Sequence, residues 1–413
     1  MFDVKLLTSQ ILIISNSRSL KLFFSLLLLP CGKFVIAPGM THIAVNTRLL
    51  LPGTTEGIAR YAIEVLKRMA TRHPEVRFSF LFDRPFSEEF VFSENVEPIV
   101  VFPPARHPAL WYTWFHLTAK WKVERLKPDL YFSPEFYLSN VKDIPKVAVF
   151  HDVAYERHPE ILSPLYGWYV RKFSRIYQAQ ADHILTVSEF NKQDIHEVYG
   201  TPLDKISVAY NGISDFFGPI EEEQKQQVRE RYSQGQPYFL FVGTIQPRKN
   251  LDNLFLAFDR FKSETGSPAK LLIVGKKGWQ YDGIYQTYEG LHHRADVLFP
   301  GPKYGAELNE LYAAAQAMTF VPFYEGFGIP IVEAMQAETP VLCANVSCMP
   351  EVYGDAAYEV DPFDVEGMTR GLKRLAEDDA LRQDLIAKGR IRRERYTWDR
   401  GYEASWAALE QFL

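Results

Sequence analysis

Two glutamates flank a glycine-containing turn in the stretch FVPFYEGFGIPIVEAM, residues 320–335. Glu325 precedes Gly-Phe-Gly, and Glu333 stands eight positions later. Pro330 suits the first turn of a helix, so we expect a helix to begin there with Glu333 about one turn inside it. Glu333 has apolar neighbours on both sides, where a carboxylate needs a partner. Sugar hydroxyls can donate hydrogen bonds to it, so the stretch is a candidate for binding a sugar or a ribose.

A basic pair, Arg248 and Lys249, follows an apolar run in the string YFLFVGTIQPRKNLDN. Asn250 is the predicted N-cap of the next helix, whose apolar residues recur at helical spacing: Leu251, Leu254, Phe258 and Phe261. Free N–H groups and the positive dipole end at such a helix start favour an anion. An ordinary solvated loop could also hold two basic residues. Their place after a strand favours phosphate binding.

His151 and Asp152 directly follow the apolar run KVAVF. A single histidine in a protein is more often structural than catalytic. A His-Asp pair that opens into a cleft at the carboxyl end of a strand is nevertheless a candidate for chemistry. From the residues alone, both interpretations stay open.

Short apolar, β-rich runs alternate with helical segments from Met40 onward, which predicts parallel sheets covered by helices on both faces. The predicted strands of the first half are HIAVN, RFSFLF, PIVVF, DLYFS, KVAVF, HILTV and ISVAY. Ser188 is the predicted N-cap of the helix that follows HILTV. Those of the second half are YFLFVG, KLLIVG, DVLFPG, AMTFVPF and PVLCAN. The predicted fold class is therefore α/β, with two doubly wound, Rossmann-like units in tandem. Ligands of such sheets bind beyond the carboxyl ends of the strands, where the candidate residues stand.

The predicted domains are residues 40–214, 215–395 and a final helix at 396–413 that we expect to pack back on the first domain. Residues 1–39 are predicted to be an extension outside the fold. Their apolar run, Leu22–Leu29, is far below the ~20 residues that span a bilayer. The run could be the core of a weak signal peptide. A poorly ordered extension or an upstream mis-start is favoured instead, because MTHIAVNTRLLLPG reads as a natural beginning.

The string VGTIQPRKN, followed by EGFGIPIVEAM and then AETPVLCANVSCMPEVYGDAAYEVDP, resembles glycosyltransferase family 4, also called group 1. One Glu-(x)7-Glu is a weak signal, but the whole string in order is specific. The resemblance covers roughly residues 40–410. It implies a GT-B fold, in which two Rossmann-like domains face each other across a cleft. It also implies a retaining enzyme that uses a nucleotide sugar, similar to bacterial mannosyltransferases of surface-polysaccharide assembly.

The resemblance also implies roles for individual residues. Arg248 and Lys249 would hold the donor diphosphate, Glu325 the transferred sugar and Glu333 the ribose. The turn at Gly326, Phe327 and Gly328 would contact the sugar or the phosphate. The loops after two strands would border the base, with Gly275 in one and Pro302 and Lys303 in the other. On the first domain, His151 matches the histidine that lies beside the donor sugar in this family. Gly57, Arg60 and Asp152 match positions near the acceptor or the diphosphate. Glu56 and Ala59 depart from the family's glycine pattern there, which leaves the path of this loop open.

We expect catalysis to rest on His151, Glu325, Lys249 and Arg248, without a metal and without a cofactor. The sequence contains no Asp-x-Asp, the pattern that could hold a divalent ion on a diphosphate, and no carboxylate is an obvious nucleophile. The favoured donor is GDP-mannose, and the expected acceptor is a glycan or a polyprenyl-linked sugar. Alternatives are a sugar phosphorylase or polysaccharide synthase on this fold, or a non-catalytic carbohydrate-binding subunit. A nicotinamide enzyme is disfavoured, because no G-x-G-x-x-G follows a strand.

Composition restricts the partners. The net charge of −5 gives no reason to expect nucleic acid. Three cysteines without a metal-ligand spacing favour buried thiols in a reducing, cytoplasmic compartment. The stretch ARHPALWYTWFHLTAKWKVERLKPDL, residues 105–130, mixes tryptophans with lysine and arginine. It predicts either a helix that buries its aromatic residues or a helix that contacts the inner face of the cell membrane.

Overall fold

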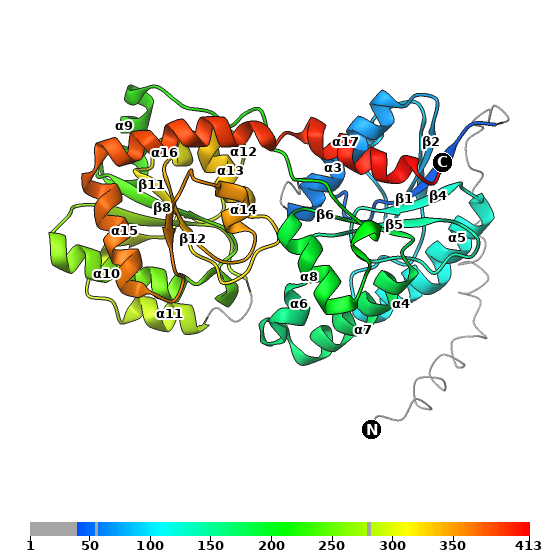
Figure 1. The fold of residues 1–413 in the computed structure, drawn as a ribbon, viewed down its shortest axis with the longest axis horizontal. Helices are drawn as coiled ribbons and strands as arrows, with labels where there is room; N and C mark the ends of the chain where they lie inside the picture. Colours follow the sequence, from blue (N-terminus) through cyan, green and yellow to red (C-terminus); the bar gives the residue numbers. More distant parts are fainter. Residues whose placement is uncertain (1–38, 54–56, 279–281) are drawn as a thin grey trace. The chain divides into compact units, whose positions relative to one another are not determined.

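The computed structural model describes residues 39–413 except 54–56 and 279–281 (Figure 1). The predicted extension at residues 1–39, and Cys31 within it, therefore lie outside the described residues apart from Gly39. Residues Thr41–Leu413 form one compact unit. It contains two parallel sheets, as the alternation of strands and helices predicted.

Seven parallel strands form the first sheet, in the order β3-β2-β1-β4-β5-β6-β7. Their bounds are β1 (His42–Asn46), β2 (Arg77–Phe82), β3 (Val96–Val100), β4 (Leu130–Ser133), β5 (Lys146–Phe150), β6 (His183–Thr186) and β7 (Ile206–Val208). All seven correspond to predicted strands, although β3 begins two residues before the predicted PIVVF. The order reverses direction beside β1, which is typical of a doubly wound sheet.

Six parallel strands form the second sheet, in the order β10-β9-β8-β11-β12-β13. Their bounds are β8 (Tyr238–Val242), β9 (Lys270–Val274), β10 (Val297–Leu298), β11 (Ala317–Phe320), β12 (Val341–Ala344) and β13 (Tyr358–Val360). The edge strand β13 was missed in the sequence, because three residues with a single buried side chain leave no periodic signal. β8 and β11 are neighbours, so the loops that follow them start side by side.

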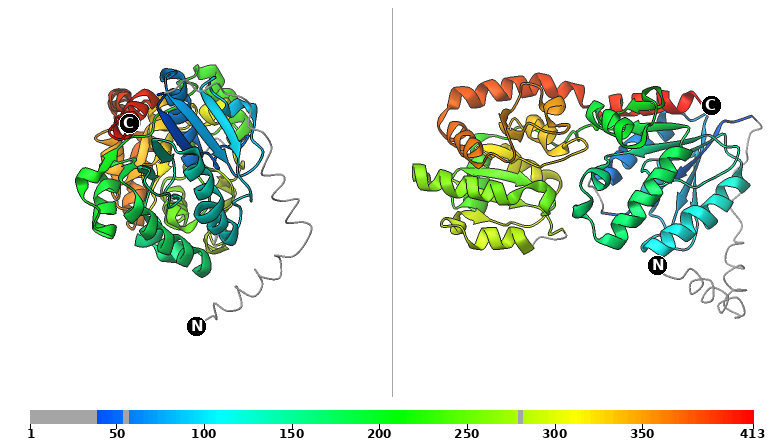
Figure 2. Two further views of the ribbon diagram at one scale, coloured as in Figure 1. Left: turned by 90° about the vertical axis from the view of Figure 1, so that its right-hand side faces the viewer. Right: turned by 60° about the horizontal axis from the view of Figure 1, so that its bottom comes forward.

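Helices cover both faces of the two sheets (Figures 1 and 2). Those of the first domain are α3 (Gly57–Arg72), η2 (Glu88–Phe90), α4 (Pro108–Thr113), the π-helical turn η3 (Trp114–Thr118), α5 (Ala119–Leu126), α6 (Ala154–Arg157), η4 (Pro159–Ile161), α7 (Pro164–Gln180), α8 (Glu189–Tyr199) and η5 (Leu203–Lys205). The second domain has α9 (Glu222–Ser233), η6 (Pro247–Lys249), α10 (Leu251–Thr265), α11 (Asp282–Glu289), η7 (Arg294–Asp296), α12 (Gly305–Ala313), α13 (Ile329–Gln336), α14 (Met349–Tyr353), α15 (Val365–Glu377), α16 (Asp379–Arg392) and η8 (Arg393–Arg395). The last helix is α17 (Trp398–Glu410).

The strands of the first sheet bury both faces. In β1, Ile43 and Val45 pack into one apolar layer and Ala44 into the other. This period of two follows from the pleat, and it explains why the strands read as continuous apolar runs. The thiols of Cys343 and Cys348 are buried, as predicted, and burial raises the pKa of both.

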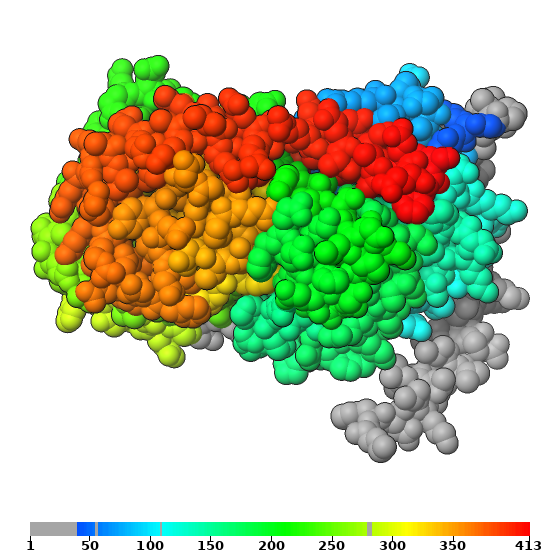
Figure 3. All heavy atoms as spheres, viewed as in Figure 1, coloured from blue at the N-terminus to red at the C-terminus, as the bar shows by residue number. Residues whose placement is uncertain are grey.

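Helix α17 packs against α3 of the first domain, where the red and blue segments meet in Figure 3. The hydroxyls of Tyr61 and Ser405 lie 2.9 Å apart across this contact, and Tyr402 hydrogen-bonds His73. A Cβ at Gly401 would lie 2.4 Å from the Tyr210 carbonyl oxygen, so only glycine allows the helix to approach so closely.

Two of the predicted helix starts are confirmed and a third is not. Ser188 caps α8 by accepting a hydrogen bond from the Asn191 amide, and Pro330 lies in the first turn of α13. The predicted cap by Asn250 is wrong. Asn250 adopts a left-handed conformation with φ of 58° and makes no side-chain cap bond, whereas capping residues usually adopt extended backbone angles.

Candidate active site

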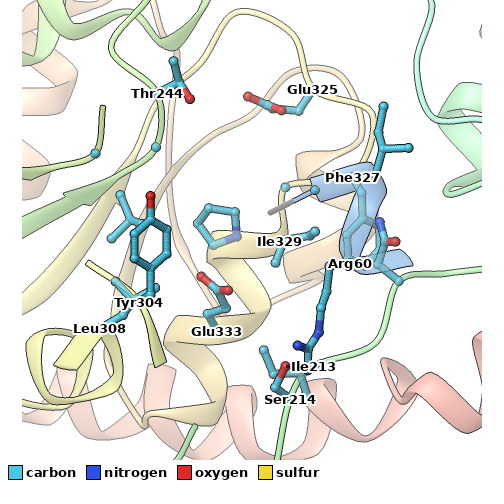
Figure 4. Close-up of a pocket in the computed structure, with 18 of the residues that line it drawn as sticks. Arg60, Ile213, Ser214, Thr244, Tyr304, Leu308, Glu325, Phe327, Ile329 and Glu333 are labelled. Atoms are coloured by element: carbon cyan, nitrogen blue, oxygen red, sulfur yellow. Dashed lines mark hydrogen bonds between the residues drawn. The ribbon is translucent and has the colours of Figure 1, made fainter. Parts of the chain in front are cut away.

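A cavity of about 690 Å³ lies at the carboxyl ends of the strands and is lined by both domains (Figure 4). All the residues that the sequence singled out line it: Gly57, Arg60, His151, Asp152, Arg248, Lys249, Gly275, Pro302, Lys303, Glu325, Gly326, Phe327, Gly328 and Glu333. The strand-end rule explains this, because each of them lies in a loop after a parallel strand or in the first turns of the following helix.

The centre of the site is a buried cluster of Arg248, Lys249 and Glu325. The loop after β8 supplies both cations and the loop after the adjacent β11 supplies the carboxylate. Glu325 accepts a hydrogen bond from Lys249 Nζ and forms an ion pair with Arg248 Nη1 at 2.9 Å. Arg248 also donates to the Tyr324 carbonyl oxygen at 2.6 Å. Sequence reasoning placed these groups in one site but missed that they contact each other.

The cluster carries a net positive charge. Burial alone would raise the pKa of Glu325, but Arg248 and then Lys249 outweigh it and hold this pKa below its usual value. Burial lowers the pKa of Lys249, and the carboxylate only partly offsets this. The two buried cations therefore face the ionised carboxylate of Glu325, with Asp152 as a further partner, at a place where charges interact more strongly than in bulk water.

The Gly-Phe-Gly turn brings the chain unusually close to the first domain. A Cβ at Gly326 would lie 2.0 Å from the His151 carbonyl oxygen, so a side chain has no room there. Gly328 has a φ of 84° and forms the N-cap of α13. The free N–H groups of α13 thus begin beside Glu325, and they add to the positive potential of the cavity.

Glu333 lies one turn into α13 and points into the cavity, on a different side from Glu325 (Figure 4). The Tyr312 hydroxyl donates a hydrogen bond to it at 2.8 Å. Burial raises the pKa of Glu333 to about 7, although this hydrogen bond and the charge of Arg60 oppose the shift. Tyr312 is therefore one partner of the Glu333 carboxylate, for which sugar hydroxyls were predicted. The second carboxylate oxygen of Glu333 is available to a ligand.

His151 is held in one tautomer. Its Nε2 donates to the Pro134 carbonyl oxygen at 2.9 Å, which leaves Nδ1 as an acceptor. Burial lowers the pKa of His151 to about 4, so the imidazole is neutral near pH 7. The ring also packs edge-to-face on Tyr61, with 5.0 Å between centroids. A neutral imidazole of this kind can accept a hydrogen bond from a hydroxyl but has no proton to give from Nδ1.

Asp152 accepts a hydrogen bond from the Ala154 amide at 3.1 Å. Burial raises the pKa of Asp152, with the positive charge of Arg248 opposing the shift.

The remaining candidates form the rim. Arg60 donates to the Ser214 hydroxyl at 2.8 Å and pairs with Glu64, so it ties α3 to the segment that connects the domains. Gly57, with φ of 53°, is the first residue of α3. Lys303 pairs with Glu307 at 2.8 Å. Several residues that line the cavity were not predicted from the sequence: Thr244, Tyr304, Leu308, Ser214 and Trp398. Of these, only Thr244 could have been found, because it closely follows a strand.

Two family descriptions match almost the whole described chain. The family described as Glycosyl transferases group 1 matches residues 222–392, and Glycosyltransferase Family 4 matches residues 55–215. The chain belongs to these glycosyltransferases. Its relatives include O-antigen chain mannosyltransferase B of Escherichia coli, which is 30% identical over 83% of this chain and 93% of that protein. O-antigen chain mannosyltransferase RfbU of Salmonella typhimurium is 29% identical over 55% of this chain and 60% of that protein.

Solved glycosyltransferase structures show the same GT-B fold. WaaG, a glycosyltransferase involved in lipopolysaccharide biosynthesis, superposes with a TM-score of 0.69 at 18% identity, over 89% of this chain and 98% of that one. A sucrose-phosphate synthase from Thermosynechococcus elongatus gives a TM-score of 0.71 at 17% identity, over 90% and 98% of the two chains. Both predicted features, the family and the two-domain α/β fold, are thereby confirmed.

The described part of this glycosyltransferase lacks two features, a cluster of metal-ligating side chains and a membrane-spanning helix. Among the described residues, no group of three or more His, Cys, Asp or Glu side chains is arranged to hold a metal ion. No helix within the same ranges is long and apolar enough to cross a bilayer.

The raised pKa of Glu333 predicts a pH-dependent stability difference for Glu333→Gln. Because the folded-state pKa of about 7 lies above the usual 4.5, the cost of burying the charge is absent below pH 4.5 and complete above pH 7. The variant avoids this cost. Urea denaturation measures the free energy of unfolding of the variant and of the wild type at each pH. The excess of the variant over the wild type should be roughly 1–3 kcal/mol larger at pH 8 than at pH 5.

Glu403→Gln, at an exposed position of α17, is the control and should show the same difference at both pH values. An equal effect of Glu333→Gln at pH 5 and pH 8 would show that the folded-state pKa is not raised.

Proposed function

We propose that this glycosyltransferase moves mannose from GDP-mannose to a hydroxyl of a glycan or polyprenyl-linked acceptor, with retention of configuration and without a metal ion. The observation that carries the proposal is the buried cluster of Arg248, Lys249 and Glu325 beside the start of α13. It combines the charge that a diphosphate needs with a carboxylate for sugar hydroxyls. Support for mannose comes from the two O-antigen mannosyltransferases that the chain resembles.

The donor would lie along the cavity from Glu325 to Glu333. Its diphosphate would contact Arg248 and Lys249, and the mannose would contact Glu325, the Gly-Phe-Gly turn and His151. The ribose hydroxyls would donate to Glu333, whose second oxygen is available. The base would then border the loops that hold three predicted residues: Gly275, Pro302 and Lys303.

In the proposed reaction, the bond between the anomeric carbon and the diphosphate oxygen breaks while the acceptor oxygen attacks the same face of the sugar. The acceptor proton passes to the departing phosphate oxygen, so no protein base is required. Arg248 and Lys249 stabilise the charge that develops on the diphosphate. Glu325 is engaged by both cations and Glu333 would contact the ribose, so neither suits the role of covalent nucleophile.

Lys249→Ala should lower kcat with GDP-mannose by at least about 100-fold, because it removes one of the two charges on the leaving group. The fold should persist, since Glu325 keeps Arg248 as its partner. Turnover is measured by release of GDP, and folding by circular dichroism. Arg260→Ala, an exposed cation on α10, is the matched control and should retain wild-type turnover.

A wild-type rate in folded Lys249→Ala would refute the assigned role. A higher rate with UDP or ADP sugars than with GDP-mannose in the wild type would refute the proposed donor.

Metal independence makes a separate prediction. Turnover after treatment with EDTA should stay within about twofold of the untreated rate, because the two cations supply the charge that a divalent ion would provide. Added Mg²⁺ should then cause no further increase. Loss of activity in EDTA with recovery in Mg²⁺ would contradict the proposal.

We further propose that the first domain contacts an anionic membrane that carries the acceptor. The supporting feature is a surface formed by α7 and the segment from α4 to α5, which pack together through Tyr112 and Phe173 (Figure 2). These helices hold six lysine and arginine residues and one acid, although the whole chain has a net charge of −5. Large apolar side chains are exposed on them: Leu110, Tyr112, Leu117, Trp121, Leu165 and Trp168.

Each exposed tryptophan of this surface has a cation against its ring. Lys172 Nζ lies 4.8 Å from the ring centre of Trp168, and the Arg125 guanidinium lies 5.3 Å from that of Trp121. Amphipathic rings beside basic groups suit the level of lipid headgroups, where each cation contributes roughly 1 kcal/mol. Within residues 105–130, Trp114 and Phe115 are buried, as the first of the two predicted alternatives requires, while Trp121 is exposed and its contact with a membrane stays a prediction.

The wild type should float with vesicles of phosphatidylglycerol and phosphatidylcholine, and less so at high salt. The double variant Trp121→Ser, Trp168→Ser should lose most of this binding. Leu256→Ser, at an exposed position of α10, should behave as the wild type. Recovery of the wild type entirely in the unbound fraction would contradict the membrane proposal without affecting the proposed reaction.

A further inference from the structure

An aromatic pair outside the cavity has no role in the reaction described above. Phe363, in the loop between β13 and α15, is 68% exposed. It stacks on the half-buried ring of Phe323, with 4.9 Å between centroids and 5° between planes. One face of the Phe363 ring is covered by Phe323, and most of the remaining ring surface faces solvent.

The pair adjoins the cluster that binds the donor. Phe323 stands three residues after β11 and Phe363 three residues after β13, so both belong to the carboxyl edge of the second sheet. The Phe323 amide donates to the Arg248 carbonyl oxygen at 3.0 Å. The stacked rings are therefore connected to the phosphate-binding loop by one backbone hydrogen bond.

Asn250 holds the pair in place. Its buried side-chain amide donates to the Val321 carbonyl oxygen at 2.9 Å and to that of Pro362 at 2.7 Å. These two carbonyls belong to the two loops that carry the rings. The same residue directly follows Lys249 and adopts a left-handed conformation with φ of 58°, which asparagine adopts more readily than most residues.

We propose that Phe363 and Phe323 form a stacking platform for a pyranose ring of the acceptor glycan, one or more residues away from the sugar that receives the mannose. The inference rests on the proposed function in that it takes the acceptor to be a glycan. A pyranose presents a face of C–H groups that can cover an aromatic ring, while its hydroxyls stay at the edge in water. Burial of this apolar area supplies the binding energy.

Position and chemistry both favour a sugar as the occupant. Arg248 lines the cavity, and the backbone bond from Phe323 places the stacked rings next to the loop that holds it. A glycan whose end lies between His151 and Glu325 and that extends past this loop meets the rings. Asp361 is exposed two residues before Phe363, where it can accept hydrogen bonds from sugar hydroxyls. A fixed, flat ring with a carboxylate beside it matches one sugar residue.

The kinetic test compares a long and a short acceptor with the same reactive end, a synthetic mannotetraoside and a monomannoside. In Phe363→Ala, the ratio of kcat/KM for the long acceptor to that for the short one should fall about tenfold, through a higher KM for the long acceptor. Phe363→Trp should keep the wild-type ratio because it restores a flat ring. Ile391→Ala, a 74% exposed apolar residue on α16, is the matched control and should also keep it.

A binding measurement separates the platform from the reaction. Saturation-transfer NMR of mannotetraose with the full chain, without donor, should show transfer to the C–H protons of an internal residue in the wild type and its loss in Phe363→Ala. An unchanged NMR pattern together with an unchanged kinetic ratio would overturn the platform. So would a change of oligomeric state or of vesicle binding in Phe363→Ala, since each identifies another occupant. If the enzyme moves mannose to none of the acceptors but the NMR difference between wild type and Phe363→Ala is present, the proposed function is refuted instead.

Discussion

The site depends on the burial of two cations with a single carboxylate. Arg248 and Lys249 share Glu325, and the cluster lies in a cavity where burial already lowers the pKa of the lysine. Charges removed from water need partners, and Glu325, with Asp152 as a further partner of both cations, is what the protein provides. Under the proposed function, the diphosphate of the donor is the anion that this cluster attracts. Its departure as a leaving group is then the step that most requires positive charge.

The topology of the second sheet makes this cluster possible. β8 and β11 are neighbours, so residues more than seventy positions apart in the sequence meet where their strands end. The next turn must then pass beside the first domain, and Gly326 allows it to touch the His151 carbonyl oxygen. That contact brings the neutral imidazole to the same cavity. The strand order, the absence of a side chain at Gly326 and the fixed tautomer of His151 are in this sense parts of one arrangement.

The sequence predicted the features that are local or that follow from the strand-end rule. Twelve strands, the cap at Ser188 and the position of Pro330 all have signals within a few residues. The features that were missed depend on contacts between distant segments. The engagement of Glu325 by both cations, the bond from Tyr312 to Glu333 and the two bonds made by Asn250 leave no trace in the spacing of residues. Asn250 was predicted to cap a helix because asparagine is a good capping residue. Its side chain instead makes tertiary hydrogen bonds to the Val321 and Pro362 carbonyls.

The two hydrogen bonds of the Asn250 amide also limit how this enzyme can vary. One side chain holds the loop after β11 and the loop after β13, and its own backbone continues from Lys249. A change in the length of the β13–α15 loop would displace the Pro362 carbonyl and disturb the geometry around Lys249. If the exposed ring at position 363 binds the acceptor as proposed, acceptor preference can diverge readily by exchange of that ring, and only with difficulty by insertion or deletion.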